Sequence, residues 1–410
     1  PSADGRRDVV VTVEEAAATT LSYGGGLEIT RRLMTTEPGQ KAQQQFDFGP
    51  RGFFDIGRRN IAGKNRSINL FTRLALRPKN ATSTSDPNAT DSGGFGFAEY
   101  RVVGAYREPR ALGMRNADLT VTAVVEQGVR TSFNFKRQGI NADVIRPFTT
   151  RIRGNVRYSF NTTATFDEQL SEEEQFNIDK VFPEVRLSAF SGGLLFDSRD
   201  DVLEPSRGSL LTGDVTLAAR ALGGELGFLK SYMQGSWFRA LPGRRRLVLA
   251  TRVAVGLADG FPRLAPVENP DGTTTIESLE DLPASERFFA GGGTTIRGFG
   301  LDEVGAPNTI SSTGFPTGGN AVVILNAELR VPVPIFKGFG IAAFVDGGNV
   351  FQRVTQMDFG ELRGSYGAGI RYISPIGPLR LDFGFKMDRR VIGGTRESGW
   401  AYHFSFGQAF

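Results

Sequence analysis

One segment of the 410-residue chain combines a fixed charge with unusual backbone freedom: residues 288–299, which read FFAGGGTTIRGF. The glycines permit sharp turns and close backbone approaches, and they deliver a single cation, Arg297. A guanidinium presents a planar fork of donors that suits a carboxylate in a bidentate pair. The segment lies in a loop of about sixty residues, a length that usually carries function. The other members of the motif are Gly292, Gly293, Ile296, Gly298 and Phe299.

Other kinds of chemistry lack the residues that they need. The chain has no cysteine, which excludes disulfides and thiolate metal sites, and its one histidine, His403, belongs to no evident Ser-His-Asp arrangement. The glycine run does not lie on a strand-to-helix turn, so nucleotide binding is unsupported. The formal net charge of +4 is too small to indicate nucleic-acid binding. We therefore expect no enzymatic chemistry, no cofactor and no metal.

The elements that must position Arg297 are strands with one apolar and one polar face. In residues 379–387 (LRLDFGFKM) the odd positions are large and apolar, and the even positions are Arg, Asp, Gly and Lys. Strand side chains alternate between faces, and the same alternation places Glu328 and Asp346 on polar faces. No run approaches the roughly 20 apolar residues that a spanning helix needs. A barrel in lipid explains the pattern, because the bilayer covers the apolar face and the polar face lines a lumen.

Sixteen segments show this strand pattern, an even number, as single-chain bacterial barrels require. They are 21–34, 42–57, 64–77, 95–107, 117–126, 130–139, 148–163, 183–197, 208–220, 228–240, 246–257, 320–332, 339–347, 362–373, 377–388 and 399–410. We predict an all-β fold over residues 17–410, a 16-stranded antiparallel transmembrane β-barrel. The loop that carries Arg297 is expected to insert into the lumen between strands 11 and 12. A short strand within residues 1–16 reads as the end of an upstream domain.

Six motifs, in the right order, resemble the BamA/TamA superfamily of outer-membrane assembly factors. The resemblance covers nearly the whole chain, and IRGF at residues 296–299 is similar to the family's signature loop motif. The other motifs are RNIAG at 59–63, FDSRD at 196–200 followed by Pro205 and Gly208, NAE at 326–328, FVDGGNVF at 344–351 and SPIGPL at 374–379. The resemblance implies that residues 1–16 are the end of a truncated periplasmic POTRA domain.

The resemblance also assigns a role to the arginine. It implies that Arg297 folds back into the lumen and meets acidic residues on the barrel wall, where Glu328 and Asp346 occupy the matching positions. Both carboxylates already fall on polar faces by strand alternation. Removing one partner of such a pair would leave the other charge uncompensated.

In this family a seam between the first and last strands opens, and client strands use the exposed edge as a template. Glycine weakens strand pairing, so glycines on both strands fit such a seam. The aromatic residues that alternate towards the C-terminus look like the recognition signal that outer-membrane barrels carry, while His403 has the opposite parity and is expected to face the lumen. The residues assigned to the seam and the signal are Gly24, Gly25, Gly26, Tyr402, Phe404, Phe406, Gly407 and Phe410.

The resemblance implies an insertase of the bacterial outer membrane that assists folding and insertion of β-barrel proteins. Its expected partners are outer-membrane lipid, unfolded β-barrel clients, and accessory lipoproteins or periplasmic proteins reached through missing POTRA domains. The main alternative is a two-partner secretion transporter that exports a dedicated polypeptide through the barrel. A barrel that anchors a fused enzyme is a further alternative, and a plain porin is disfavoured because it needs no arginine loop with paired wall acids.

Overall fold

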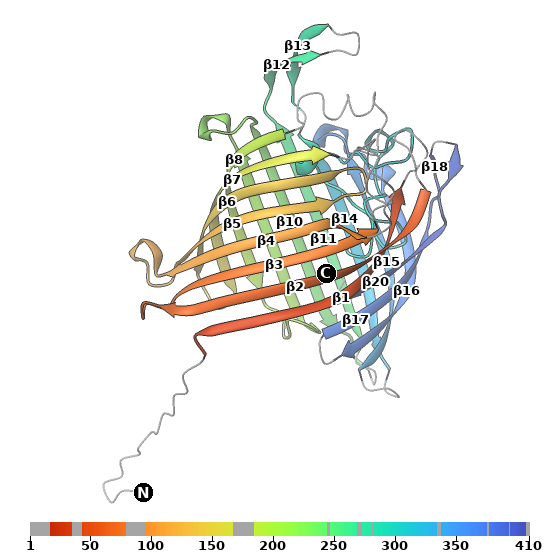
Figure 1. The fold of residues 1–410 in the computed structure, drawn as a ribbon. Coiled ribbons are helices and arrows are strands. Elements are labelled where there is room, and N and C mark those ends of the chain that lie inside the picture. The colour runs from red at the N-terminus through yellow and green to blue at the C-terminus, as the bar shows by residue number, and fades with distance from the viewer. Residues whose placement is uncertain are drawn as a thin grey trace, which may run out of the picture.

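The computed structural model describes residues 17–34, 43–78, 95–166, 184–243, 247–268, 273–280, 282–333, 338–374, 377–392 and 394–406. Sixteen antiparallel strands form one sheet, which curls into a barrel (Figure 1). In sheet order they are β1 (Thr19–Met34), β2 (Gln43–Ile61), β3 (Arg66–Pro78), β4 (Phe95–Pro109), β5 (Asp118–Val129), β6 (Asn134–Pro147), β7 (Ile152–Phe166), β8 (Glu184–Asp197), β9 (Gly208–Ala218), β10 (Phe228–Ala240), β11 (Val248–Gly260), β14 (Ala321–Pro332), β15 (Phe339–Phe351), β16 (Arg363–Ser374), β17 (Gly377–Lys386) and β20 (Trp400–Phe406).

Smaller elements lie in the connections. The hairpin of β12 (Arg263–Glu268) and β13 (Thr274–Leu279) projects beyond one end of the barrel (Figure 1), and β18 (Val391–Ile392) pairs with β19 (Thr395–Arg396). Short 3-10 helices are η2 (Ala111–Gly113), η3 (Arg220–Leu222), η4 (Ala284–Glu286), η5 (Pro307–Thr309), η6 (Val354–Gln356) and η7 (Phe359–Glu361). Among the residues described, no helix is long and apolar enough to cross a bilayer.

The predicted strand number and fold class are confirmed, while several strand limits differ from those predicted. β2 continues to Ile61, past a register shift between Arg58 and Ile61. Asn60, within this shift, has a φ of 53°, and Ala62, in the turn to β3, has a φ of 55°. β15 runs to Phe351 rather than 347, because its last residues still pair with the start of β14. Neither short hairpin was predicted. The expected POTRA end at residues 1–16 lies outside the described residues.

The two faces of the strands differ as the alternation predicts. Along β15, Ile341 and Val345 are 51% and 52% exposed on the outer face, whereas Asp346 is 1% exposed. The most buried apolar side chains lie inside the barrel, where Ile296 of the long loop packs in a cluster with Val322, Ile324 and other residues of the wall. The buried cluster therefore lies between the loop and the strands β8 to β11, β14 and β15, while the outer face carries exposed apolar groups.

A charge placed at the middle of this outer face tests the barrel orientation. Val345 lies at the centre of β15, so Val345→Arg should lower the stability of the lipid-embedded barrel by about 2–4 kcal/mol, as an arginine does near the bilayer midplane. The free energy of unfolding in lipid vesicles checks this expectation. Phe359→Arg is the control, because Phe359 is exposed in η7, outside the strands. Equal effects of the two substitutions would contradict the orientation.

Candidate functional site

The functional candidate is the long loop between β11 and β14, whose residues 282–320 fold back into the barrel. Isolated bridges shape it, pairing Phe288 with Gly319 and Ala290 with Val304. Its motif reaches the inner face of β14 to β17, where Ile296, Arg297, Gly298 and Phe299 are buried. The motif that was expected to insert into the lumen is therefore among the most buried of the described segments.

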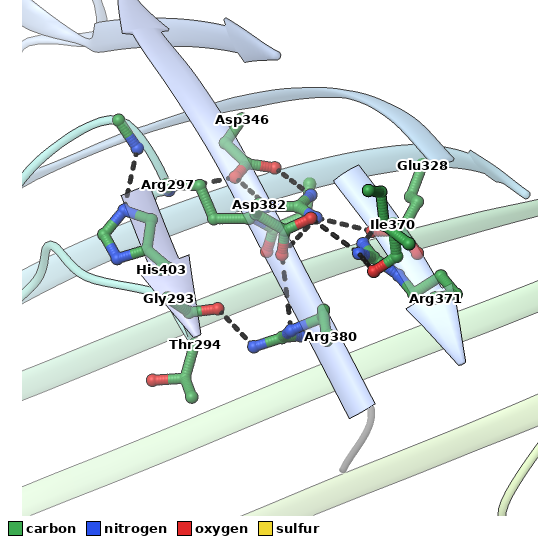
Figure 2. Close-up of polar contacts among 12 residues, drawn as sticks. Gly293, Thr294, Arg297, Glu328, Asp346, Ile370, Arg371, Arg380, Asp382 and His403 are labelled. Carbon is green, nitrogen blue, oxygen red and sulfur yellow. Dashed lines mark hydrogen bonds and ion pairs between the residues drawn. The ribbon is translucent and has the colours of Figure 1, made fainter. Parts of the chain in front are cut away.

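Arg297 is held by two carboxylates of the wall (Figure 2). Its Nε and Nη2 donate to the two oxygens of Asp346 at 2.7 and 2.8 Å, which is a bidentate pair. Its Nη1 donates to Glu328 Oε2 at 2.5 Å, and its backbone N–H donates to Asp346 Oδ2 at 3.0 Å. The three side chains are almost completely buried. The structure thus brings together the three residues that the sequence analysis paired.

Phe344 completes the binding of the guanidinium. The Arg297 Cζ lies 3.6 Å from the centre of the Phe344 ring, a distance at which the negative face of the ring attracts the cation. Phe344 is buried and shares the inward parity of Asp346 on β15. Phe344 was not among the residues predicted to contact Arg297, although an aromatic side chain among inward positions is a detectable exception to the apolar-out pattern.

Around Arg297 and its two carboxylates, the wall carries further charged side chains of alternating sign, which were not predicted from the sequence. Arg330 and Arg371 both bind Glu328, at 2.9 and 2.8 Å. Arg371 also donates to Asp382 at 2.7 Å, and the Arg380 Nε lies 3.3 Å from the same carboxylate. Each acid is therefore shared between cations from neighbouring strands. Removing one arginine other than Arg297 leaves Glu328 with other partners, whereas the bidentate partner of Asp346 is Arg297 itself.

Glycines allow the loop to approach the wall this closely. Gly298 has a φ of +88°, and a Cβ at its position would lie 3.1 Å from the backbone carbon of Gly384 and from the Ser365 Cβ. Conversely, a Cβ on Gly384 would lie 2.5 Å from the Gly298 nitrogen. Gly291 and Gly292 also have positive φ angles, which favour glycine, whereas Gly293 does not.

Phe299 forms a second anchor, between two cations of the wall. The Arg363 Cζ lies 4.6 Å and the Lys386 Nζ 4.7 Å from the centre of its ring. Arg363 in turn donates to Glu397 through Nη1 at 2.9 Å and Nη2 at 2.5 Å. Burial opposes the charge on Glu397, but the Arg363 hydrogen bonds prevail and hold the pKa of Glu397 below its ordinary value. The loop is thus fixed by charge pairs at Arg297 and by cation–π contacts at Phe299.

The other parts of the loop reach the opposite side of the lumen. Glu286 lies within 3.4 Å of Arg137 on β6 and 3.2 Å of Lys230 on β10. In the turn between β5 and β6, the hydroxyl of Thr131 donates to the Leu301 carbonyl at 3.1 Å, and that of Ser132 donates to the Pro316 carbonyl. The loop consequently braces strands from both halves of the sheet.

The turn between β8 and β9 contains the predicted mid-barrel motif, at a distance in sequence from the arginine. Asp200 accepts hydrogen bonds from the Ser206 hydroxyl and from the backbone N–H groups of Ser206 and Arg207, which hold its pKa well below the ordinary value. Gly208 has a φ of +96°, and a Cβ there would meet the Ser198 carbonyl. The motif therefore shapes a rigid turn, and the described contacts do not bring it to Arg297.

The residues assigned to the seam lie on the end strands of the sheet. Gly24, Gly25 and Gly26 are paired with β2 in an uninterrupted register, and the ring of Phe53 covers Gly24. Phe404 is exposed and Tyr402 is half-buried on β20. Phe406 is the last residue of that strand, while Gly407 and Phe410 lie outside the described residues. Their role in opening a seam stays a prediction.

His403 faces the lumen and contacts the loop. The Gly298 N–H donates to its Nε2 at 3.1 Å (Figure 2). Within the described part of the chain, no group of three or more His, Cys, Asp and Glu side chains is suited to a metal ion. The arrangement holds the backbone of the loop against the barrel wall through hydrogen bonds and charge pairs.

Close backbone packing of the loop can be tested without removing any charge. Gly384→Ala puts a methyl group against the Gly298 backbone, so the motif should be displaced from the wall at a cost of about 1–3 kcal/mol. Amide hydrogen exchange over residues 294–300 should become faster. Gly104→Ala is the matched control, because nothing lies within 4 Å of a Cβ at that strand position. Unchanged exchange in the Gly384 variant would contradict the proposed close packing.

Comparisons with known proteins agree with this architecture. The BamA crystal structure from Haemophilus ducreyi lacking POTRA domains 1–3 superposes with a TM-score of 0.68 at 16% identity, covering 96% of this chain and 71% of that one. The outer membrane protein assembly factor BamA of Nitratidesulfovibrio vulgaris is 28% identical over 218 residues, covering 52% of this chain and 24% of that protein. The sorting and assembly machinery component 50 homolog of Bos taurus is 29% identical over 249 residues, covering 55% and 46%.

The aligned parts span less than half the length of these two curated relatives. Residues 60–410 match the model of the Omp85 superfamily domain, which is most of the chain. The expected location in a bacterial outer membrane is confirmed by these matches. The chain belongs to the Omp85 superfamily.

Proposed function

We propose that this barrel is an outer-membrane insertase, which assists folding and insertion of other β-barrel proteins through the seam between β1 and β20. The observation that carries the proposal is the position of β1 and β20 at the two ends of the sheet order, where β1 pairs with β2 and β20 pairs with β17. The proposed seam joins the remaining edges of these two end strands.

A strand edge of this kind supplies what an incoming strand needs. Its N–H and C=O groups offer a template for β-augmentation, which gives affinity through the main chain with little dependence on sequence. A nascent barrel strand must satisfy every backbone polar group before it can enter the bilayer core. Pairing with β1 would satisfy one side of that strand, so the insertase needs no covalent step and no cofactor.

The docked loop supports this function over the alternative of a secretion transporter. Residues 282–320 contact strands on both sides of the lumen, so a polypeptide travelling through the barrel would have to displace them. Activity at the seam requires no polypeptide to pass the contacts that the loop makes across the lumen. The names of the bacterial and bovine relatives, an assembly factor and a sorting and assembly component, point in the same direction.

The proposed partners follow from this activity. They are outer-membrane lipid, which contacts the apolar outer face, and unfolded β-barrel clients, which contact the seam. A POTRA domain that ends within residues 1–16 would receive clients on the periplasmic side and provide the contact with accessory lipoproteins.

The loop motif can be separated from the wall by a single substitution. Arg297→Ala leaves Asp346 buried without its bidentate partner, which costs about 3–5 kcal/mol at the docking site, while the strand ladders of the barrel remain. We expect a folded barrel with weakened function in a complementation assay. Arg353→Ala is the control, since Arg353 is exposed beyond the end of β15. Full activity of the Arg297 variant would remove the loop from the mechanism.

Depletion of the gene product in its own bacterium tests the function itself. The outer-membrane proteome should lose many unrelated β-barrel proteins, because a strand edge that pairs with the client's backbone can serve clients of different sequence. Quantitative mass spectrometry of outer-membrane fractions provides the measurement. Loss of a single secreted protein, with other barrels unchanged, would instead identify a dedicated export pore.

A further inference from the structure

The last strand, β20, is held by two contacts, a backbone ladder with β17 and a side-chain hydrogen bond with the loop in the lumen. On its backbone, β20 pairs with β17 over seven residues, with Asp382 opposite His403 at the centre of the ladder. On its lumen side, the His403 imidazole accepts the backbone N–H of Gly298 at 3.1 Å. Gly298 follows Arg297 directly, so one peptide unit separates the end strand from the docked arginine.

The loop encloses the imidazole from two directions. A Cβ at Gly293 would lie 3.1 Å from the His403 Cβ, so the chain from Gly293 to Gly298 passes around this side chain. Arg380 of β17 donates to the Gly293 carbonyl at 2.7 Å and fixes the first of these glycines. The Gly298 amide is buried, and an amide that loses its acceptor in such a place leaves an unsatisfied donor.

The hydrogen bond also fixes the protonation state and the tautomer of His403. Accepting at Nε2 requires an unprotonated nitrogen, so the proton of the neutral ring is on Nδ1. The neutral form suits the surroundings, because Arg297 and Arg380 are the cations on the neighbouring loop and strand, and Asp382 is already shared by Arg371 and Arg380. The imidazole therefore acts as an acceptor for the loop backbone and adds no charge to the network.

We infer that His403 is a positioning residue that couples docking of the Arg297 motif to anchoring of the last strand. When the motif is docked, the Gly298 amide ties β20 to the wall-bound loop. When the motif leaves the wall, that tie is lost, and the ladder with β17 remains. Given the proposed function, on which this inference rests, the loop would set how readily the seam strand is released to a client.

Amide hydrogen exchange over residues 400–406 measures the coupling in the purified full chain. In His403→Leu, which has no acceptor, exchange in β20 should become about tenfold faster or more. His403→Gln is the matched control, because its side-chain oxygen can accept the same N–H and should restore slow exchange. Exchange over β10, residues 228–240, reports whether each variant is folded. Equal exchange in the Leu variant and the original protein would overturn the inference, as would a Gln variant as fast as Leu.

A double-substitution cycle separates coupling from simple destabilisation. Arg297→Ala should speed exchange in β20 when His403 is present, and should add little when Leu replaces it, because the tie is already gone. Additive effects of the two substitutions would show that His403 does not transmit the state of the motif, and would overturn the inference.

These exchange measurements do not depend on insertase activity. If exchange in β20 responds as predicted but depletion leaves the outer-membrane proteome unchanged, the proposed function is rejected and the coupling is retained. If exchange in β20 does not respond but depletion removes many barrel proteins, the coupling is rejected and the proposed function is retained.

Discussion

The docked position of the long loop depends on one buried cation. Arg297 is 2% exposed, and its guanidinium binds the paired oxygens of Asp346, a Glu328 oxygen and the face of Phe344. A charge removed from water to this extent is stable only with its partners complete, so the loop has essentially one docked position. The neighbouring arginines on β14, β16 and β17 spread the negative charge of the wall over three strands.

Docking of this cation determines what the remainder of the loop can do. The Gly298 and Gly384 backbones touch because neither carries a side chain, and the approach brings Phe299 between Arg363 and Lys386. The far part of the loop then reaches the β5–β6 turn and the cations of β6 and β10. A connection of this length is thereby converted into a brace across the lumen.

Much of this arrangement could be predicted from sequence, for a physical reason. Lipid outside and water inside impose a strict alternation on each strand, so parity alone indicates that Glu328 and Asp346 face the lumen. Parity does not give register between strands, which decides that Arg371 and Arg380 meet at Asp382. For the same reason, the contacts of Arg363 and Lys386 with Phe299 could not be predicted from the sequence. The β12–β13 hairpin was missed because Pro266 lies within β12, where proline argues against a strand, and the segment has no alternation of apolar residues.

Site-specific photo-crosslinking to a client during insertion tests the role of the end strands most directly. A photoreactive residue would replace Leu21 on β1, Phe404 on β20 or Ile140 on β6, which are all well exposed on the outer face. If β1 and β20 form the seam, an unfolded barrel client should form adducts from positions 21 and 404, and few from position 140. Equal adducts from all three positions, or none from the end strands, would contradict templating at the seam.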